Sequence, residues 1–174
     1  PPRARAAGIA ASFHRTTGSM YYEGRGVEVN FSKVEEWWSL SARQGYADAQ
    51  FNLGLIFHNG LGVEQNVAEG MRLNLLAAEQ GHPTAQFNVG SSYDAGDGMA
   101  EDPTLAAEWY QRAAAEGGLP SAQVNLAHLY TDGRGVARDH AAAVRLYTAA
   151  AEQGESEAQV QLASALESGV GIAQ

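Results

Sequence analysis

The sequence predicts an all-α fold: a right-handed α-solenoid (superhelix) of stacked antiparallel helix pairs, with about 36 residues per repeat. One observation is a tetrad, Gly-x-Gly-hydrophobic, that occurs five times at nearly even spacing. Another is a segment of matching residues ahead of the tetrads, such as AQFNLGLIF at 49–57 and AQVNLAHLY at 122–130. Fixed periods of this length are typical of solenoids, in which each unit packs only on its neighbours. The tetrads stand at 24–27, 60–63, 96–99, 133–136 and 169–172.

The segment ahead of each tetrad has the spacing of an amphipathic helix. Ala49, Leu53 and Phe57 fall at i, i+4 and i+8, which places them on one apolar stripe. The tetrad glycines then end the helix, because glycine adopts a positive φ at little cost. First helices are therefore predicted near 47–58, 84–94, 121–131 and 156–167.

An Asn or Asp that follows each of the first four tetrads predicts the start of a second helix, because these residues are good N-caps. The four residues are Asn30, Asn66, Asp102 and Asp139. Glu69 stands three residues after Asn66, which is the spacing of a capping box. Second helices are predicted near 31–44, 67–80, 103–116 and 140–153.

Gly18, Gly54 and Gly90 lie inside first helices, where glycine normally costs about 1 kcal/mol. A small residue repeated at one register predicts close approach between helices, so Gly54→Leu should destabilise the fold by about 1–3 kcal/mol. Gly70 has no place in the repeat pattern and stands where other units hold Ala or Val. Gly70→Ala is therefore expected to be neutral or stabilising.

These residues resemble the Sel-one-like repeat (SLR) family, a relative of the tetratricopeptide repeat (TPR). The family pattern is roughly A-x-x-x-L-G-x-x-Y-x-x-G-x-G-V, then D-x-x-x-A-x-x-W and A-A-x-x-G. The second unit departs from it at Leu73, where the family favours Trp, and at Gly70. The resemblance implies one repeat domain over 1–174, with an atypical N-terminal extension at 1–12, repeats near 13–46, 47–82, 83–119 and 120–155, and a partial repeat at 156–174.

Composition excludes several classes of function. The net charge of −9 argues against nucleic acid as the main partner. No apolar run approaches the roughly 20 residues that a membrane-spanning helix needs, so membrane insertion is not expected. The absence of cysteine excludes disulfides and thiolate sites. Residues 1–22 contain arginine but no acid, which fits a transit-peptide remnant, a helical extension or a linker. The compartment stays unknown, with organellar or extracytoplasmic placement among the options.

No pattern in the chain predicts catalysis or a cofactor. The tetrads lack the Lys-Ser/Thr of a phosphate-binding loop and follow helices rather than strands. The histidines form no His-Glu-x-x-His pair, and no serine stands in a nucleophile elbow. The acidic residues around the third tetrad do not have EF-hand spacing. We therefore expect no catalytic residue, no metal site and no enzymatic activity.

The concave face, which first helices line in stacked pairs of this kind, is the predicted binding surface. Phe51, Phe87, Val124 and Val160 are expected to form an apolar row along it. Asn52, Asn88 and Asn125 form a parallel amide row, which suits the backbone of an extended peptide. Alternatively, these Asn side chains brace neighbouring helices. The predicted groove residues are Phe51, Asn52, Leu55, His58, Phe87, Asn88, Asp94, Asn125 and His128.

Two questions about large side chains stay open at this point. Trp38 is either a core residue or a partly exposed anchor for a partner. Phe51 and Phe87 either face the groove or belong to the core. Replacing both with Ser should weaken partner binding with the fold intact in the first case, and should reduce stability in the second.

The sequence favours a non-catalytic adaptor or scaffold that presents this groove to a protein or peptide partner. One alternative is a structural subunit of a larger multi-protein complex, which could be organellar and would contact several subunits. A second alternative is a small-ligand-binding or enzyme-associated module.

Overall fold

The structure is a computed structural model that describes residues 14–116 and 118–171. The predicted N-terminal extension at 1–12 lies outside the described residues. The chain divides into two compact units, residues 1–82 and 83–174. The boundary between the units coincides with the boundary between the second and third predicted repeats.

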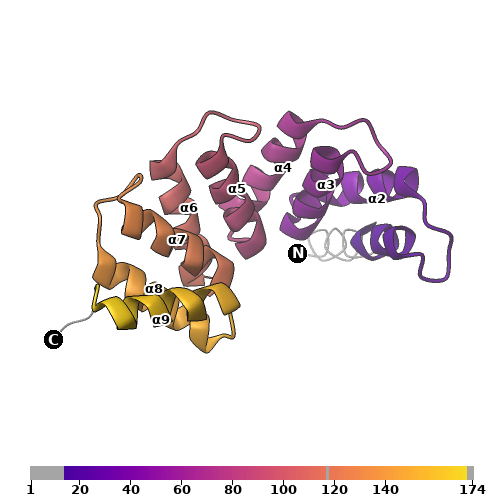
Figure 1. The fold of residues 1–174 in the computed structure, drawn as a ribbon. Coiled ribbons are helices and arrows are strands. Elements are labelled where there is room, and N and C mark those ends of the chain that lie inside the picture. Colours follow the sequence, from indigo (N-terminus) through magenta and orange to yellow (C-terminus); the bar gives the residue numbers. More distant parts are fainter. Residues whose placement is uncertain (1–13, 117, 172–174) are drawn as a thin grey trace, which may run out of the picture. The chain divides into compact units, whose positions relative to one another are not determined.

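Both units consist of consecutive helices joined by tight loops (Figure 1). In the first unit, residues 14–23 are helical and precede α2 (Phe31–Arg43), α3 (Ala47–Asn59) and α4 (Val67–Glu79). The second unit contains α5 (Pro83–Ala95), α6 (Pro103–Glu116), α7 (Pro120–Asp132), α8 (His140–Glu152) and α9 (Ser156–Ser168). The described residues contain no β-strand, and the predicted helices are confirmed to within one residue at each end.

The predicted N-caps are confirmed. The Asn30 and Asn66 side chains each accept from a backbone N–H three residues on, at 3.0 Å. Asp102 and Asp139 cap α6 and α8 in the same way. The capping box at Asn66 is only half formed, because the Glu69 carboxylate binds Arg72 and the Asn66 N–H donates to the Phe57 carbonyl at 2.8 Å.

The tetrad loops are closed by a backbone hydrogen bond that recurs in four repeats. The N–H of each N-cap residue donates to a carbonyl near the end of the preceding first helix, as Asp139 does to Tyr130 at 3.0 Å. Gly133 ends α7 at φ 68°, and Gly135 also has φ 68°. A Cβ on Gly135 would overlap the Pro103 backbone at the start of α6, so this glycine allows the loop to pack on the preceding repeat.

The core of each unit follows the predicted apolar stripe, with one difference. Ala49 and Leu53 are buried as predicted, whereas Phe57 is only partly buried and Ile56 occupies the innermost position of that turn. In the second unit the equivalent stripe of α7 contains Ala122, Leu126 and Leu129 and packs against α6.

The glycines inside first helices make room for a large side chain on the paired second helix. A Cβ on Gly90 would lie 2.8 Å from the Tyr110 ring, and one on Gly18 would overlap the Trp38 ring. The predicted close approach between helices is therefore confirmed.

Repeat two is different, because Asn74 stands where Trp38 and Tyr110 stand in their repeats. The backbones of α3 and α4 approach closely here. A Cβ on Gly54 would lie 2.9 Å from the Gly70 carbonyl oxygen, and one on Gly70 would lie 2.7 Å from the Gly54 carbonyl oxygen. The expectation that Gly70→Ala is neutral or stabilising is therefore wrong, because Gly70 is required by the helix contact.

Candidate partner-binding site

The first candidate site is a hollow around Trp38 in the first unit. The Trp38 side chain is a core residue with 4% of its surface exposed, and its indole N–H donates to the Arg15 carbonyl at 3.2 Å. Trp38 is therefore no exposed anchor. Beside its ring opens a hollow of about 180 Å³, the Trp38 hollow, between the 14–23 helix and α3. It is lined by Ser19, Tyr22, Glu23, Trp38, Asn52, Leu55, Ile56 and Leu61.

The Trp38 hollow combines apolar walls with two hydrogen-bonding groups that have no partner in the described part of the chain. Asn52 is half-buried on α3, and neither its amide nor the Tyr22 hydroxyl bonds another described residue. The other polar groups are engaged: Ser19 donates to the Arg15 carbonyl at 3.1 Å, and Glu23 pairs with Arg25 at 2.5 Å.

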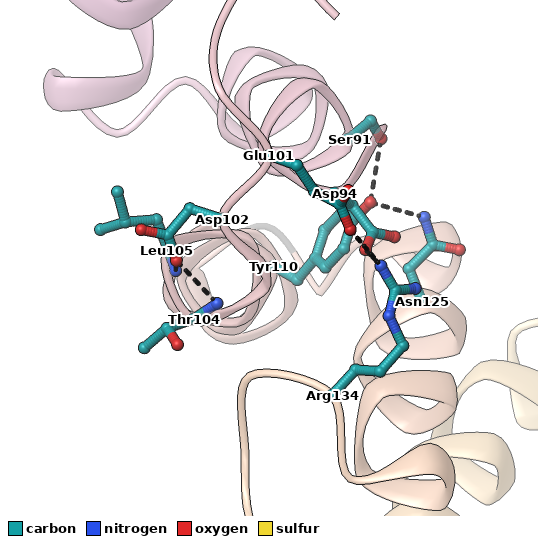
Figure 2. A network of polar contacts seen from close by, with 9 residues as sticks. All are labelled: Ser91, Asp94, Glu101, Asp102, Thr104, Leu105, Tyr110, Asn125 and Arg134. Atoms are coloured by element: carbon teal, nitrogen blue, oxygen red, sulfur yellow. Dashed lines mark hydrogen bonds and ion pairs between the residues drawn. The ribbon is translucent and has the colours of Figure 1, made fainter. Parts of the chain in front are cut away.

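In the third repeat, polar side chains at the same register bond one another (Figure 2). Ser91, Tyr110 and Asn125 are the repeat equivalents of Ser19, Trp38 and Asn52. The Tyr110 hydroxyl donates to Ser91 Oγ at 3.2 Å and accepts from Asn125 Nδ2 at 3.0 Å. Asn125 therefore braces α7 against α6, as the alternative interpretation of the amide row proposed.

Arg134 completes this network from the fourth tetrad, at the position that Leu61 occupies in the Trp38 hollow (Figure 2). Its Nη2 lies 3.0 Å from Asp94 Oδ1 and 3.2 Å from Glu101 Oε1. The charge of Asp94 is thus compensated within the unit. Asp102 of the same acidic segment is turned toward the start of α6, where it accepts from the Thr104 and Leu105 amides.

The fourth repeat has a hollow beside Tyr147, which stands at the register of Trp38 and Tyr110. The Tyr147 hollow has a volume of about 180 Å³ and lies between α7, α8 and α9. Gln161 stands here in the register of Asn52, and Val170 in the register of Leu61 and Arg134. Burial raises the pKa of the Tyr147 hydroxyl, and a hydrogen bond with Thr131 opposes that shift. The hollow is lined by Thr131, His140, Ala143, Val144, Tyr147, Gln161, Ser164, Ala165, Ser168 and Val170.

Phe51 packs against a loop residue of its own unit. Its ring is stacked on His82 with 4.5 Å between ring centroids, and it is half-buried. His82 Nε2 lies 3.8 Å from Asp48 Oδ1, and Arg15 approaches the other Asp48 oxygen at 3.9 Å. His58 is half-buried near the end of α3, where its carbonyl accepts from Gln65 at 2.8 Å.

In the second unit, Phe87 lies against the Tyr110 ring at 5.8 Å between centroids and borders the core. Asn88 is half-buried and makes no hydrogen bond to the described residues. His128 joins α7 to α9, because its Nε2 lies 3.2 Å from Glu157 Oε1 and its ring meets Tyr147 edge-on.

The predicted apolar row is wrong at Val124. This side chain is 2% exposed and packs with Ala127, Ala143 and Tyr147 in the core between α7 and α8. Val160, at the same register on α9, is 67% exposed. The difference arises because burial at this register depends on the neighbouring helices and not on the side chain itself.

Sequence reasoning gave no role to the glutamine that follows Ala at the start of each of the last four first helices. Gln50, Gln86 and Gln123 are buried. Gln50 Nε2 donates to the Ala42 carbonyl at 3.2 Å, while its Oε1 accepts from Gln80 at 2.7 Å. Gln153 donates to Gln123 in the same manner. The repetition of Ala-Gln was the available signal, and it marks a side chain that satisfies the carbonyls at the end of the preceding helix.

The described residues hold no group of three His, Asp or Glu side chains that could bind a metal ion. Within residues 14–116 and 118–171, every helix is too short or too polar to cross a membrane. What the hollows offer chemically is an apolar cavity of side-chain size with amide and hydroxyl groups at its edge. Such an arrangement suits an extended peptide, which presents an apolar side chain beside backbone N–H and C=O groups.

Paired helices, Gly-x-Gly loops and side-chain-sized hollows together define a helical-repeat protein, a class that generally binds other proteins. The Sel1 repeat family matches residues 17–46, 47–82, 83–118, 120–155 and 156–174, so the chain belongs to the Sel1 repeat family. The resemblance inferred from the sequence is confirmed.

Two solved structures resemble this chain in both fold and sequence. One is a protective antigen present in uropathogenic Escherichia coli strains that displays an SLR fold, with 34% identity over 99% of this chain and a TM-score of 0.91. The other is a Sel1 repeat protein from Oxalobacter formigenes, with 36% identity over 94% of this chain and a TM-score of 0.87. The predicted all-α solenoid of antiparallel helix pairs is therefore confirmed.

Two further matches cover less of this chain. Helicobacter pylori cysteine rich protein B shares the fold over 67% of this chain, with a TM-score of 0.55 and 15% identity. A putative sel1-like repeat-containing protein of Acanthamoeba polyphaga mimivirus is 51% identical over 37 residues, which is 21% of this chain and 7% of that protein. The chain spans 37% of the Escherichia coli structure and 64% of the Oxalobacter structure.

Proposed function

We propose that this chain is a non-catalytic adaptor that binds a protein or peptide partner on the surface of its first helices. The observation that carries the proposal is the Trp38 hollow, an apolar cavity of about 180 Å³ edged by the Asn52 amide and the Tyr22 hydroxyl. An apolar side chain of the partner occupies the cavity, and its backbone bonds Asn52.

The contrast between Asn52 and Asn125 supports this role. The two residues share a register, yet Asn125 is bonded to Tyr110 whereas Asn52 bonds no described residue. An amide that braced helices would have a protein partner in both repeats. Asn52 instead has one donor and one acceptor group available to a ligand.

The remaining predicted groove residues are assigned unit by unit. In the first unit, Leu55 lines the hollow and Phe51 and His58 flank it along α3. In the second unit, we assign the partner-binding amide to Asn88, which lies beside Phe87 and makes no hydrogen bond to the described residues. Asp94, Asn125 and His128 have partners within the unit, so we assign them a supporting role in shaping the surface.

The test uses peptides selected from a random library on the wild-type chain. Asn52→Ala should weaken the binding of the selected peptides about twofold to tenfold, because one hydrogen bond contributes roughly 0.5–1.5 kcal/mol. Asn59→Ala is the matched control, since Asn59 is an exposed amide on the same helix. Affinity is measured by calorimetry, and thermal unfolding shows whether each variant keeps the fold. Equal affinities for wild type and Asn52→Ala would overturn the proposal.

The Phe51→Ser, Phe87→Ser double variant is a less selective test. Both rings pack on residues of their own units, Phe51 on His82 and Phe87 on Tyr110, so the variant would lower stability as well as alter the surface. Asn52→Ala changes an amide that supports no other described residue, and its effect on binding is therefore easier to interpret.

A further inference from the structure

A second set of hollows lies between the second helices of neighbouring repeats. In the second unit, a hollow of about 330 Å³ opens between α6 and α8, with α7 beneath it. The first unit has a hollow of about 450 Å³ at the same register, between α2 and α4. We name them the α6–α8 hollow and the α2–α4 hollow. Leu146 lines the first and Leu73 lines the second.

Both hollows have leucine at a register where the first and third repeats have tryptophan. Trp37 and Trp109 are the equivalents of Leu73 and Leu146. Trp109 is buried, and the Arg112 guanidinium lies over its ring at 4.5 Å from the centroid. Because leucine is shorter and narrower than an indole, the second and fourth repeats leave unfilled the space that a tryptophan reaches at this register. The hollows therefore suit an aromatic side chain supplied by another molecule.

The two hollows differ in charge at the rim. Arg72 lines the α2–α4 hollow and forms a bidentate pair with Glu69, with both N–O distances 2.7 Å. Arg145 is its equivalent in the α6–α8 hollow, but Ala142 stands in the place of Glu69. Arg145 is exposed and makes no ion pair with a carboxylate whose side chain the structure describes. A cation at the edge of an apolar cavity in a chain of net charge −9 is complementary to a carboxylate of a partner.

We propose that the α6–α8 hollow binds a partner protein segment in which an aromatic side chain stands beside an acidic one. The aromatic ring enters the space over Leu146, and the carboxylate pairs with Arg145. This surface lies on the second helices and is separate from the first-helix hollows of the proposed function. The α2–α4 hollow does not bind such a segment, because its arginine, Arg72, already pairs with Glu69.

The experiment titrates the full chain with the blocked dipeptide acetyl-Trp-Asp-amide and follows amide shifts by NMR. Shifts are expected at Leu126, Ala142 and Arg145, with weak, saturable binding. Leu146→Trp should abolish these shifts because its own indole fills the hollow, whereas the matched Leu73→Trp should leave them unchanged. Arg145→Gln should weaken the binding of acetyl-Trp-Asp-amide several-fold. Acetyl-Trp-Asn-amide, which lacks the carboxylate, should bind the wild type equally weakly.

Ala142→Glu gives an independent test, because it changes the charge at the hollow and adds no aromatic ring to it. It reproduces in the fourth repeat the pair that Arg72 and Glu69 make in the second, so it should weaken binding as much as Arg145→Gln does. Thermal unfolding of each variant shows whether the fold is retained. The proposal is overturned if the wild type shows no saturable shifts, if the Asp and Asn peptides bind equally, or if folded Ala142→Glu binds like the wild type.

Discussion

Gly54 and Gly70 face each other where α3 and α4 pack, and neither position has room for a Cβ. The close contact accompanies the loss of a ring, because Asn74 replaces the aromatic residue that Trp38 and Tyr110 supply in their repeats. With no ring to hold the helices apart, the backbones themselves come into contact. The glycine at position 70 therefore accompanies the asparagine at position 74, and it is not an irregularity of the repeat.

Gly70→Ala should therefore destabilise the chain by about 1–3 kcal/mol, the cost of overpacking a tight contact. A Cβ there would lie 2.7 Å from the Gly54 carbonyl oxygen and 2.8 Å from the His58 nitrogen, both of which are backbone atoms that cannot rotate away. Gly54→Leu should be at least as harmful. Denaturant titration measures both variants. If Gly70→Ala were as stable as the wild type, α3 and α4 could separate freely and the contact would have no energetic importance.

The Tyr110 hydroxyl should make stability sensitive to alkaline pH. Burial raises its pKa above the ordinary value near 10, and the hydrogen bonds with Ser91 and Asn125 lower it by less. Above about pH 10 the unfolded chain releases this proton while the folded chain keeps it, so the folded state binds more protons and the free energy of unfolding falls as pH rises.

Tyr110→Phe should show a smaller loss of stability between about pH 9 and pH 11 than the wild type. Near neutral pH it should cost about 1 kcal/mol, because the bonds to Ser91 and Asn125 are lost. Urea titrations at several pH values measure both effects. Burial also raises the pKa of Tyr147, so Tyr110→Phe should still lose some stability at alkaline pH. An unchanged alkaline slope would show that Tyr110 does not contribute to it.

At the scale of the element, α9 differs from the other first helices in how little of it is covered. Ala158 is its one fully buried residue, while Val160 and Leu166 are 67% and 60% exposed. It packs on α8, whereas α7 has α6 on one side and α8 on the other. In a repeat array each helix owes its stability to such neighbours.

Amide hydrogen exchange should therefore be faster in α9 than in α7, since helices with few buried contacts open at a lower free energy. The comparison is internal to the second unit, so it needs no second protein. His128→Ala should increase exchange in α9 further, because it removes the contact with Glu157 at 3.2 Å. Equal protection of α7 and α9 in the wild type would contradict the expectation.

At the scale of the whole molecule, the repeat preserves the helices and varies the surface. One register carries the Trp38 hollow, the Tyr110 network and the Tyr147 hollow in three different repeats. Leu61, Arg134 and Val170 share the second position of the tetrad, and of these three Arg134 carries a charge and pairs with Asp94. The same Gly-x-Gly loop thus supplies either a wall of a cavity or a cation that pairs with acidic side chains of the preceding repeat.

The sequence by itself determined the helices, their caps and their order, because those features depend on residues close together in the chain. Asn30 as an N-cap needs only the amide three residues on. The tertiary structure decided which polar and apolar side chains are available to a partner. Asn52 and Asn125 share a register, and each stands between a Gln two residues before and a Leu one residue after. Val124 and Val160 likewise share a register, and each follows Ala-Gln. Whether each is bonded, buried or exposed depends on side chains from neighbouring helices, such as Tyr110 and Tyr147, that are distant in the sequence and meet only in the folded chain.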